Sequence, residues 1–200
     1  GGAQVVVMFG VTSATGPLLA VAAAAKYPAQ FILGSVGGDA TTLKALGVPA
    51  AVLTGAQGAS FLPSPADTTD EYVKLFQEIN AKYNNNVAFD NNVLVGMNSA
   101  MMTVQALRAA GKNLTRAGLI AAIQSKGATF ASAGLAPLNY SATSQVGYNG
   151  YWFGQYDSTG AMKPLSGGVV VYTTDSGTGA VVKSSYKRPA MPAKGLPTNS

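Results

Sequence analysis

The sequence predicts an α/β protein in which a parallel sheet carries helices on both faces. Short apolar runs of strand length alternate with stretches of helical composition over residues 3–61. Small-residue turns separate them, beginning at Gly10 and at Gly34. Alternation of this kind implies parallel strands joined by helical crossovers. Because such sheets bind ligands at the carboxyl ends of their strands, these two turns are the first candidates for a binding site.

The first expected strand is Gln4–Phe9, whose three consecutive valines indicate a strand buried on both faces. The turn Gly10–Gly16 then leads to a helix over Pro17–Lys26, which is rich in leucine and alanine. Pro17 suits the first turn of that helix. Phe31–Leu33 is the second expected strand.

The second strand is followed by a glycine-rich turn and then by Asp39, which suits the N-cap of a helix around Thr42–Leu46. A third strand is expected within Ala50–Phe61. The first 61 residues therefore read as strand, helix, strand, helix and strand.

A helix over Thr69–Tyr83 follows a crossover segment, Leu62–Asp67, that two prolines stiffen. Apolar residues recur in this helix at spacings of three and four. Asp67 or Thr68 is expected to cap it.

Two further helices are expected, over Val93–Ala110 and over Arg116–Ser125. Gly111 stands just past the end of the first, and Thr115 begins the second. Three methionines at helical spacing are interpreted as core residues: Met97, Met101 and Met102.

The last fifty residues have β character. We expect an aromatic strand at Tyr151–Tyr156, a turn at Asp157–Gly160, a strand at Val169–Tyr172 and a further turn near Gly177. The segment Lys183–Ser200 has three prolines and few apolar residues, so it is expected to be extended or mobile.

The aromatic strand carries no evident chemistry of its own. Trp152 and its neighbours Tyr151 and Phe153 are interpreted as sheet packing.

Composition excludes several classes of function. Charged residues make up 10% of the chain, and the net charge of +5 comes from scattered basic residues, so no nucleic-acid partner is expected. The chain has no cysteine and no histidine, which removes thiolate chemistry, the commonest zinc ligands and the usual general base. We therefore expect no catalytic residues, no metal and no cofactor. A chain so poor in charge and rich in small polar residues leans towards an extracytoplasmic location.

The order of segments is fairly specific when it is taken together. The most distinctive piece is Gly111–Arg116 followed by a Leu-Ile helix. The other pieces are Ala3–Met8, Phe31–Ser35, Gly55–Pro63, Glu71–Tyr83, Phe89–Leu107 and Gly134–Tyr140. This order resembles the second half of bacterial solute-binding proteins of the branched-chain amino acid (leucine-binding) type, which have the type I periplasmic binding protein fold.

The resemblance implies two Rossmann-like α/β lobes that close on a small ligand in the cleft between them. Residues 1–63 and 135–200 would form a C-terminal-type lobe, and residues 64–134 would be a helical contribution to the N-terminal-type lobe. The rest of that second lobe is absent from this sequence, so the second lobe is incomplete. The Gly-Gly start is interpreted as that of a fragment or a processed product, with any signal peptide removed.

By this resemblance the ligand contacts of the first lobe fall on Val11, Thr12, Ser13, Ser35 and Val36. Thr12 and Ser13 stand where a helix begins, so their hydroxyls and the free backbone N–H groups can receive a carboxylate. The alternative is that one of these two residues only caps that helix. Ser35 can likewise be an ordinary turn residue.

Two asparagines, Asn91 and Asn92, precede the long helix near the expected hinge. They either reach the ligand or cap the helix.

Amino-acid-binding members of the resembled class place an acid after the second strand, where this chain has Ser35. The nearest acid, Asp39, is expected to be a cap. Without a carboxylate there, an α-amino ligand loses a contact worth about 1.5–3 kcal/mol. A neutral or carboxylate-bearing molecule therefore suits the site at least as well as leucine does.

The turn Gly10–Gly16 also resembles a dinucleotide-binding loop, but its spacing differs from Gly-x-Gly-x-x-Gly and no acid ends the second strand. An NAD(P)-dependent enzyme is thus a remote alternative. A Ser-His-Asp triad is impossible in a chain without histidine.

The sequence therefore predicts an extracytoplasmic solute-binding protein, in the periplasm or at the cell surface, that could be lipid-anchored through a missing N-terminus. It would deliver a small polar organic molecule, amino-acid-like or carboxylate-bearing, to the membrane permease of an ABC importer. The missing N-terminal half is a further expected partner. The alternative is the same fold acting as a ligand sensor with a protein partner.

Overall fold

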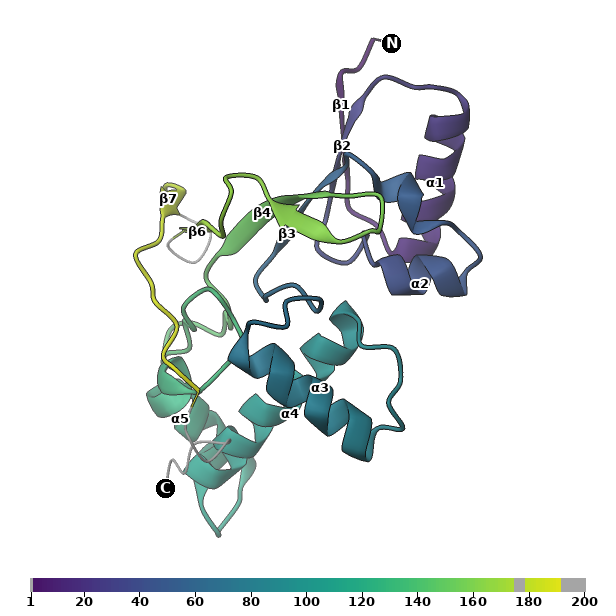
Figure 1. The fold of residues 1–200 in the computed structure, drawn as a ribbon. Helices are drawn as coiled ribbons and strands as arrows, with labels where there is room; N and C mark the ends of the chain where they lie inside the picture. Colours follow the sequence, from purple (N-terminus) through teal and green to yellow (C-terminus); the bar gives the residue numbers. More distant parts are fainter. Residues whose placement is uncertain (1, 175–178, 192–200) are drawn as a thin grey trace. The chain divides into compact units, whose positions relative to one another are not determined.

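The computed structural model describes residues 2–174 and 179–191. The chain divides into two compact units (Figure 1). Unit 1 comprises Gly1–Ser60 and Trp152–Val170, and unit 2 comprises Phe61–Tyr151 and Val171–Ser200. The predicted assignment of residues to two lobes concerns the complete protein and stays a prediction.

Unit 1 begins with the predicted alternation of strands and helices. In chain order its elements are β1 (Val5–Met8), α1 (Thr12–Ala24), β2 (Gln30–Leu33), α2 (Ala40–Ala45), the 3-10 helix η1 (Ala50–Leu53), β3 (Gln57–Ser60), β4 (Tyr151–Tyr156) and β5 (Met162–Pro164). The α/β class expected from the sequence is thereby confirmed.

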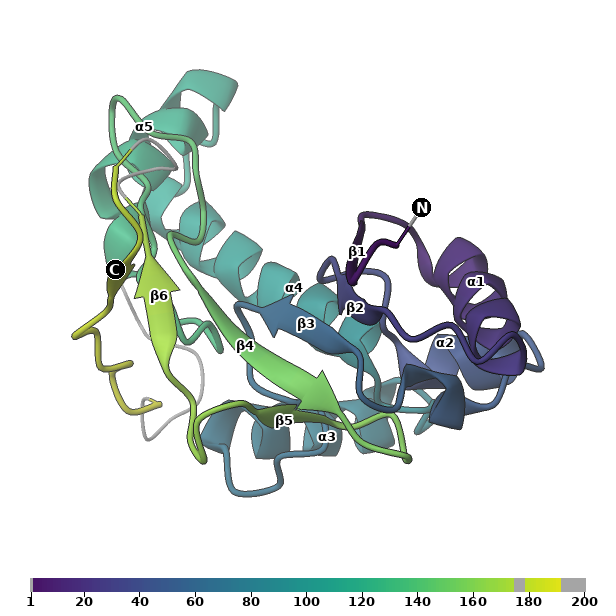
Figure 2. The ribbon, with the colours of Figure 1, turned by 90° about the horizontal axis from the view of Figure 1, so that it is seen from above.

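The sheet of unit 1 is mixed. β1 pairs in parallel with β2, and β2 pairs in parallel with β3, as predicted. β4 then runs antiparallel to β3, with Ser60 opposite Trp152, and β5 folds back antiparallel on β4 (Figure 2). The Asp157 carboxylate closes this hairpin by accepting from the N–H groups of Thr159 and Ala161. The predicted turn at Asp157–Gly160 is therefore confirmed.

One face of β1 is uncovered in unit 1. Val5 and Val7 are 52% and 60% exposed, whereas Val6 and Met8 are half-buried. The prediction that this strand is buried on both faces is wrong for these residues. Helices α1 and α2, which connect successive parallel strands, pack against each other and against η1 on one face of the sheet. The core of unit 1 forms there, from buried side chains that include Leu19, Leu33, Leu43, Leu53 and Tyr156.

Helix α1 begins five residues earlier than the sequence predicts. It starts at Thr12 instead of Pro17, and Pro17 lies inside it. The glycines at both ends of Gly10–Gly16 indicated a turn, but the Thr-Ser-Ala-Thr run between them is helical. Asp39 caps α2 as predicted, since its carboxylate accepts the N–H of Thr42 at 2.6 Å.

Unit 2 is mainly helical in its described part. Its elements are α3 (Glu71–Tyr83), α4 (Asn91–Ala110), α5 (Arg116–Lys126), the 3-10 helix η2 (Gly127–Thr129), β6 (Val171–Thr173) and β7 (Val182–Lys183). Helix α4 contacts both α3 and α5. The main core cluster lies around α3 and α4 and includes Tyr72, Val73, Phe76, Leu94 and Met101.

The cap of α3 differs from the prediction. Asp70 caps α3 by accepting the N–H groups of Tyr72 and Val73 at 3.0 and 3.1 Å. Asp67, which was expected in that role, accepts instead from the N–H and the hydroxyl of Thr69. The hydroxyl bond is the largest of the effects that lower the pKa of Asp67.

The ends of α4 and the start of α5 follow simple capping rules. Asp90 caps α4, because its carboxylate accepts the N–H of Val93 at 2.8 Å. Gly111 ends that helix with a φ of +79°, and Thr115 caps α5 by accepting the N–H of Gly118. The predictions for Gly111 and Thr115 are confirmed.

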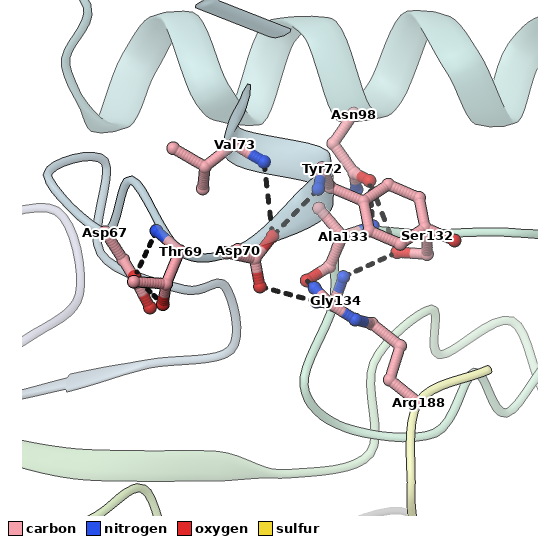
Figure 3. Close-up of polar contacts among 10 residues, drawn as sticks. All are labelled: Asp67, Thr69, Asp70, Tyr72, Val73, Asn98, Ser132, Ala133, Gly134 and Arg188. Carbon is pink, nitrogen blue, oxygen red and sulfur yellow. Dashed lines mark hydrogen bonds and ion pairs between the residues drawn. The ribbon is translucent and has the colours of Figure 1, made fainter. Parts of the chain in front are cut away.

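The described part of the C-terminal segment is anchored to unit 2. Arg188 donates to the carbonyl of Ala133 at 2.8 Å and forms an ion pair with Asp70 (Figure 3). Its guanidinium also lies 4.6 Å from the centre of the Tyr72 ring. Residues 184–191 have no helix or strand, which agrees with an extended segment, and these contacts hold it in place at Arg188. The expected turn near Gly177 and residues 192–200 lie outside the described residues.

Among the described residues, none of the helices combines the length and the apolar character that crossing a bilayer requires.

Candidate functional site

The two loops predicted to bind a ligand are in direct contact. The N–H of Gly34 donates to the carbonyl of Met8, and the hydroxyl of Thr12 donates to the carbonyl of Val36, each at 2.9 Å. Adjacent parallel strands bring their carboxyl ends to the same edge of the sheet, which is why the loops meet. We call residues 9–13 and 34–37 the loop wall.

Glycines make this close approach possible. A Cβ on Gly37 would lie 2.9 Å from the hydroxyl oxygen of Thr15 and 3.2 Å from the backbone oxygen of Gly10. A Cβ on Gly34 would lie 3.2 Å from the ring of Phe9. The small-residue character of both turns, which first singled them out in the sequence, therefore has a packing cause in the structure.

Four of the five predicted residues in the loop wall present their side chains to solvent. Val11 and Val36 are 58% and 61% exposed, and Ser13 and Ser35 are exposed as well. Thr12 is 6% exposed, and its hydroxyl is used in the bond that joins the loops. Thr12 thus holds the wall together, while the other four form its surface. Their binding role stays a prediction.

The start of α1 lies within the loop wall and has no side-chain cap. Its N-cap residue is Val11, so the alternative in which Thr12 or Ser13 caps the helix is wrong. The carbonyl of Val11 instead accepts from the N–H groups of Ala14 and Thr15, each at 3.0 Å. The N–H groups of Thr12 and Ser13 belong to the first turn, where a helix offers no acceptor of its own.

The loop wall carries no charged side chain. The residues from Phe9 to Ala25 and from Tyr27 to Gly38 include no acid and no base. The next acid, Asp39, is 6% exposed and engaged as the cap of α2. The phenol of Tyr156 lies against Gly38, and burial raises its pKa to about 12, so it is neutral at physiological pH. The wall can offer hydroxyls, backbone amides and apolar surface to a ligand.

The two remaining predicted residues, Asn91 and Asn92, lie in unit 2. Asn91 is half-buried and is the first residue of α4, and Asn92 is exposed. Because Asp90 provides the cap, the capping alternative is wrong for both asparagines. A role in ligand binding stays a prediction for them.

Unit 2 contains a pocket that the sequence did not indicate. It encloses about 400 Å³ between α4, α5 and the segments around residues 61–62 and 130–148. Most of its lining is apolar and includes Phe61, Met102, Ala106, Leu119, Ile123 and Phe130. The only signal in the sequence was the apolar spacing of α4 and α5, and that spacing is typical of ordinary core residues as well.

The polar groups beside this pocket are already bonded to one another. Asn98 is 2% exposed, accepts the N–H of Ala133 at 2.8 Å and donates to the hydroxyl of Tyr148. Ser132 also bonds to the Tyr148 hydroxyl at 2.6 Å and accepts the N–H of Gly134 (Figure 3 shows Asn98, Ser132 and Gly134). Burial raises the pKa of Tyr148. These groups therefore hold the loop over residues 132–134 in place.

A model of the periplasmic binding protein family matches residues 1–161. Since this is most of the chain, the protein belongs to that family. A search of curated proteins found no match.

Solved structures of substrate-binding proteins share the fold. One is a possible leucine/isoleucine/valine-binding protein from Rhodopirellula baltica SH 1, with 18% identity and a TM-score of 0.69 over 82% of this chain. A fatty acid ABC transporter substrate-binding protein from Thermomonospora curvata gives 22% identity and a TM-score of 0.62 over 92% of this chain. A solute-binding protein from R. palustris in complex with benzoate gives 20% identity and a TM-score of 0.61 over 83%.

This chain spans only 42%, 45% and 42%, respectively, of those three proteins. The resemblance to part of a type I periplasmic binding protein is thereby confirmed. At these identities the likeness establishes the fold alone.

Proposed function

We propose that this chain is part of an extracytoplasmic solute-binding protein that captures a small organic molecule and delivers it to the permease of an ABC importer. Membership of the periplasmic binding protein family supports this proposal. So does the kind of protein found among the similar structures, which are substrate-binding proteins of ABC transporters. The single observation that carries it is the loop wall, two joined loops at the carboxyl ends of adjacent parallel strands, where sheets of this kind bind ligands.

In this proposal the ligand lies against the loop wall without being transformed. Ser13 and Ser35 supply hydroxyls, the first turn of α1 supplies backbone N–H groups, and Val11 and Val36 supply apolar contacts. For Asn91 and Asn92 a role in ligand binding is a separate proposal. A second lobe, completed by the N-terminal half of the protein, would close over the other side of the ligand. Ligand binding would then shift a population from open to closed.

The proposed ligand is a small polar organic molecule, amino-acid-like or carboxylate-bearing. The similar proteins from Thermomonospora curvata and R. palustris are named for a fatty acid and crystallised with benzoate, respectively, and both compounds are carboxylates. The structure of a branched chain amino acid ABC transporter from Thermus thermophilus, which is also similar, holds valine. The loop wall offers hydrogen-bond donors for a carboxylate and no side-chain charge.

Thermal unfolding of the protein in its longest natural form tests this proposal. The panel contains benzoate, hexanoate, leucine, valine and their amides. A ligand present at 100 times its dissociation constant stabilises the native state by about 2.7 kcal/mol, so at least one compound should raise the melting temperature.

Two tryptophan variants localise the effect. Ser35→Trp places a bulky side chain at an exposed position of the loop wall and should abolish the shift. Ser185→Trp, at an exposed position of unit 2, should keep it. A flat response to the whole panel, or a full response from Ser35→Trp, would contradict the proposal.

A further inference from the structure

The exposed surface of the loop wall combines apolar side chains with the hydroxyls of Ser13 and Ser35, and it carries no charge. Val11 and Val36 expose more than half of their surface and come from two different loops. The bond from the Thr12 hydroxyl to the Val36 carbonyl fixes one loop against the other. Exposed apolar side chains that are grouped and rigidly held mark a binding surface more strongly than scattered ones do.

A ligand with an ammonium group would find no anion at this surface. The two loops contain no acidic residue. The nearest acid, Asp39, is buried, and its carboxylate accepts the N–H of Thr42. Removing an ammonium from water without pairing it is strongly unfavourable. The exposed polar side chains of the wall, Ser13 and Ser35, carry neutral hydroxyls.

We propose that the loop wall selects a ligand that presents an apolar group to Val11 and Val36 and carries no ammonium. Among carboxylates it would take an aliphatic or aromatic acid in preference to the α-amino acid with the same skeleton. This inference rests on the proposed function, because it names the ligand class of the same site.

A matched pair of compounds tests the inference. Leucine differs from 4-methylpentanoate only by its α-ammonium, so isothermal titration of both isolates the effect of that group. The wild-type protein should bind 4-methylpentanoate at least about tenfold more tightly than leucine, as expected for one unpaired charged group.

Four variants assign this preference to the loop wall. Ser35→Glu should reverse the preference by supplying an anion, whereas Ser35→Gln, of the same size, should not. Val36→Thr replaces one methyl group with a hydroxyl of similar size. Because one apolar contact is lost, it should weaken the binding of 4-methylpentanoate several-fold. Val21→Thr is its control, because Val21 is 67% exposed on α1 outside the wall. All these positions are exposed, so the variants should fold.

The outcomes separate this inference from the proposed function. Leucine binding as tightly as 4-methylpentanoate, or Val36→Thr binding as the wild type does, would overturn the inference and leave solute binding intact. Absence of binding by every compound in the panel would overturn both. If the wild-type protein were a dimer and the Val36→Thr variant a monomer, the wall would be a contact between copies. The inference would then also be overturned.

Discussion

Asp70 serves two structural purposes with one carboxylate. One oxygen accepts the first-turn N–H groups of α3, and the other pairs with Arg188 (Figure 3). Arg188 adds its bond to the Ala133 carbonyl, so a single side chain joins the C-terminal segment, the start of α3 and the loop after η2. Both side chains are largely buried, with 16% of Arg188 and 7% of Asp70 exposed.

Replacing Arg188 should therefore destabilise the protein markedly. Arg188→Ala leaves the buried Asp70 carboxylate unpaired and should lower the free energy of unfolding by about 3 kcal/mol. Lys187→Ala, at the exposed neighbouring position, should change it by less than about 0.5 kcal/mol. Urea denaturation measures both.

A double variant separates the ion pair from the cap. Asparagine caps helices as well as aspartate does, so Asp70→Asn removes the charge and keeps the cap. Arg188→Ala combined with Asp70→Asn should be more stable than Arg188→Ala alone, since no buried charge is left unpaired. Strictly additive losses, or an equal loss from Lys187→Ala, would show that the pair does not hold the segment.

The helix N-caps show which residue roles could be predicted from the sequence. Asp39 and Thr115 stand alone before their helices and were predictable. Asp70 and Asp90 lie among several residues that are equally able to cap, so the choice is made by packing. For Asp70 that packing includes Arg188, more than a hundred residues away in the chain.

At the scale of elements, the close approach of the two loops depends on glycines, which have no side chain. Gly37 faces the Thr15 hydroxyl and the backbone of Gly10, so the carboxyl ends of β1 and β2 can be joined only if this position stays small. By contrast Gly96, in the middle of α4, has no atom within 4 Å of where a Cβ would stand.

The same substitution should therefore have opposite effects at these two glycines. Gly37→Ala overpacks the loop wall and should cost about 1–3 kcal/mol of unfolding free energy, with weaker ligand binding. Gly96→Ala adds helix propensity without a clash and should stabilise the protein by about 0.5–1 kcal/mol. Chemical denaturation of both variants checks this, and destabilisation by Gly96→Ala together with a neutral Gly37→Ala would contradict the packing described here.

The order and type of the early elements were predictable, because apolar runs and small-residue turns mark them locally. The direction of β4 was not, since aromatic strand composition carries no information on whether a neighbour runs parallel. The pocket of unit 2 was missed for a similar reason. Met102 lines it, yet the spacing of the methionines also suits core packing, and Met101 is indeed in the core.

At the scale of the whole molecule, the family membership and the fold were predictable from the order of segments, whereas the site was predictable only in part. Alternation placed the two loops at one edge of a sheet, and the bond between Thr12 and Val36 agrees with that placement. Thr12 is buried and Val11 is exposed because α1 starts at Thr12. The sequence did not predict this start, because the glycines at 10 and 16 indicated a turn there.

We propose that the solute binds to the loop wall of unit 1. Hydrogen exchange, measured with and without the panel compound that stabilises the protein most, tests this claim directly. We expect slower exchange in peptides that cover residues 9–16 and 34–39, and no such slowing in Ser35→Trp. Slower exchange confined to residues 95–107 and 119–130, around the pocket of unit 2, would contradict it.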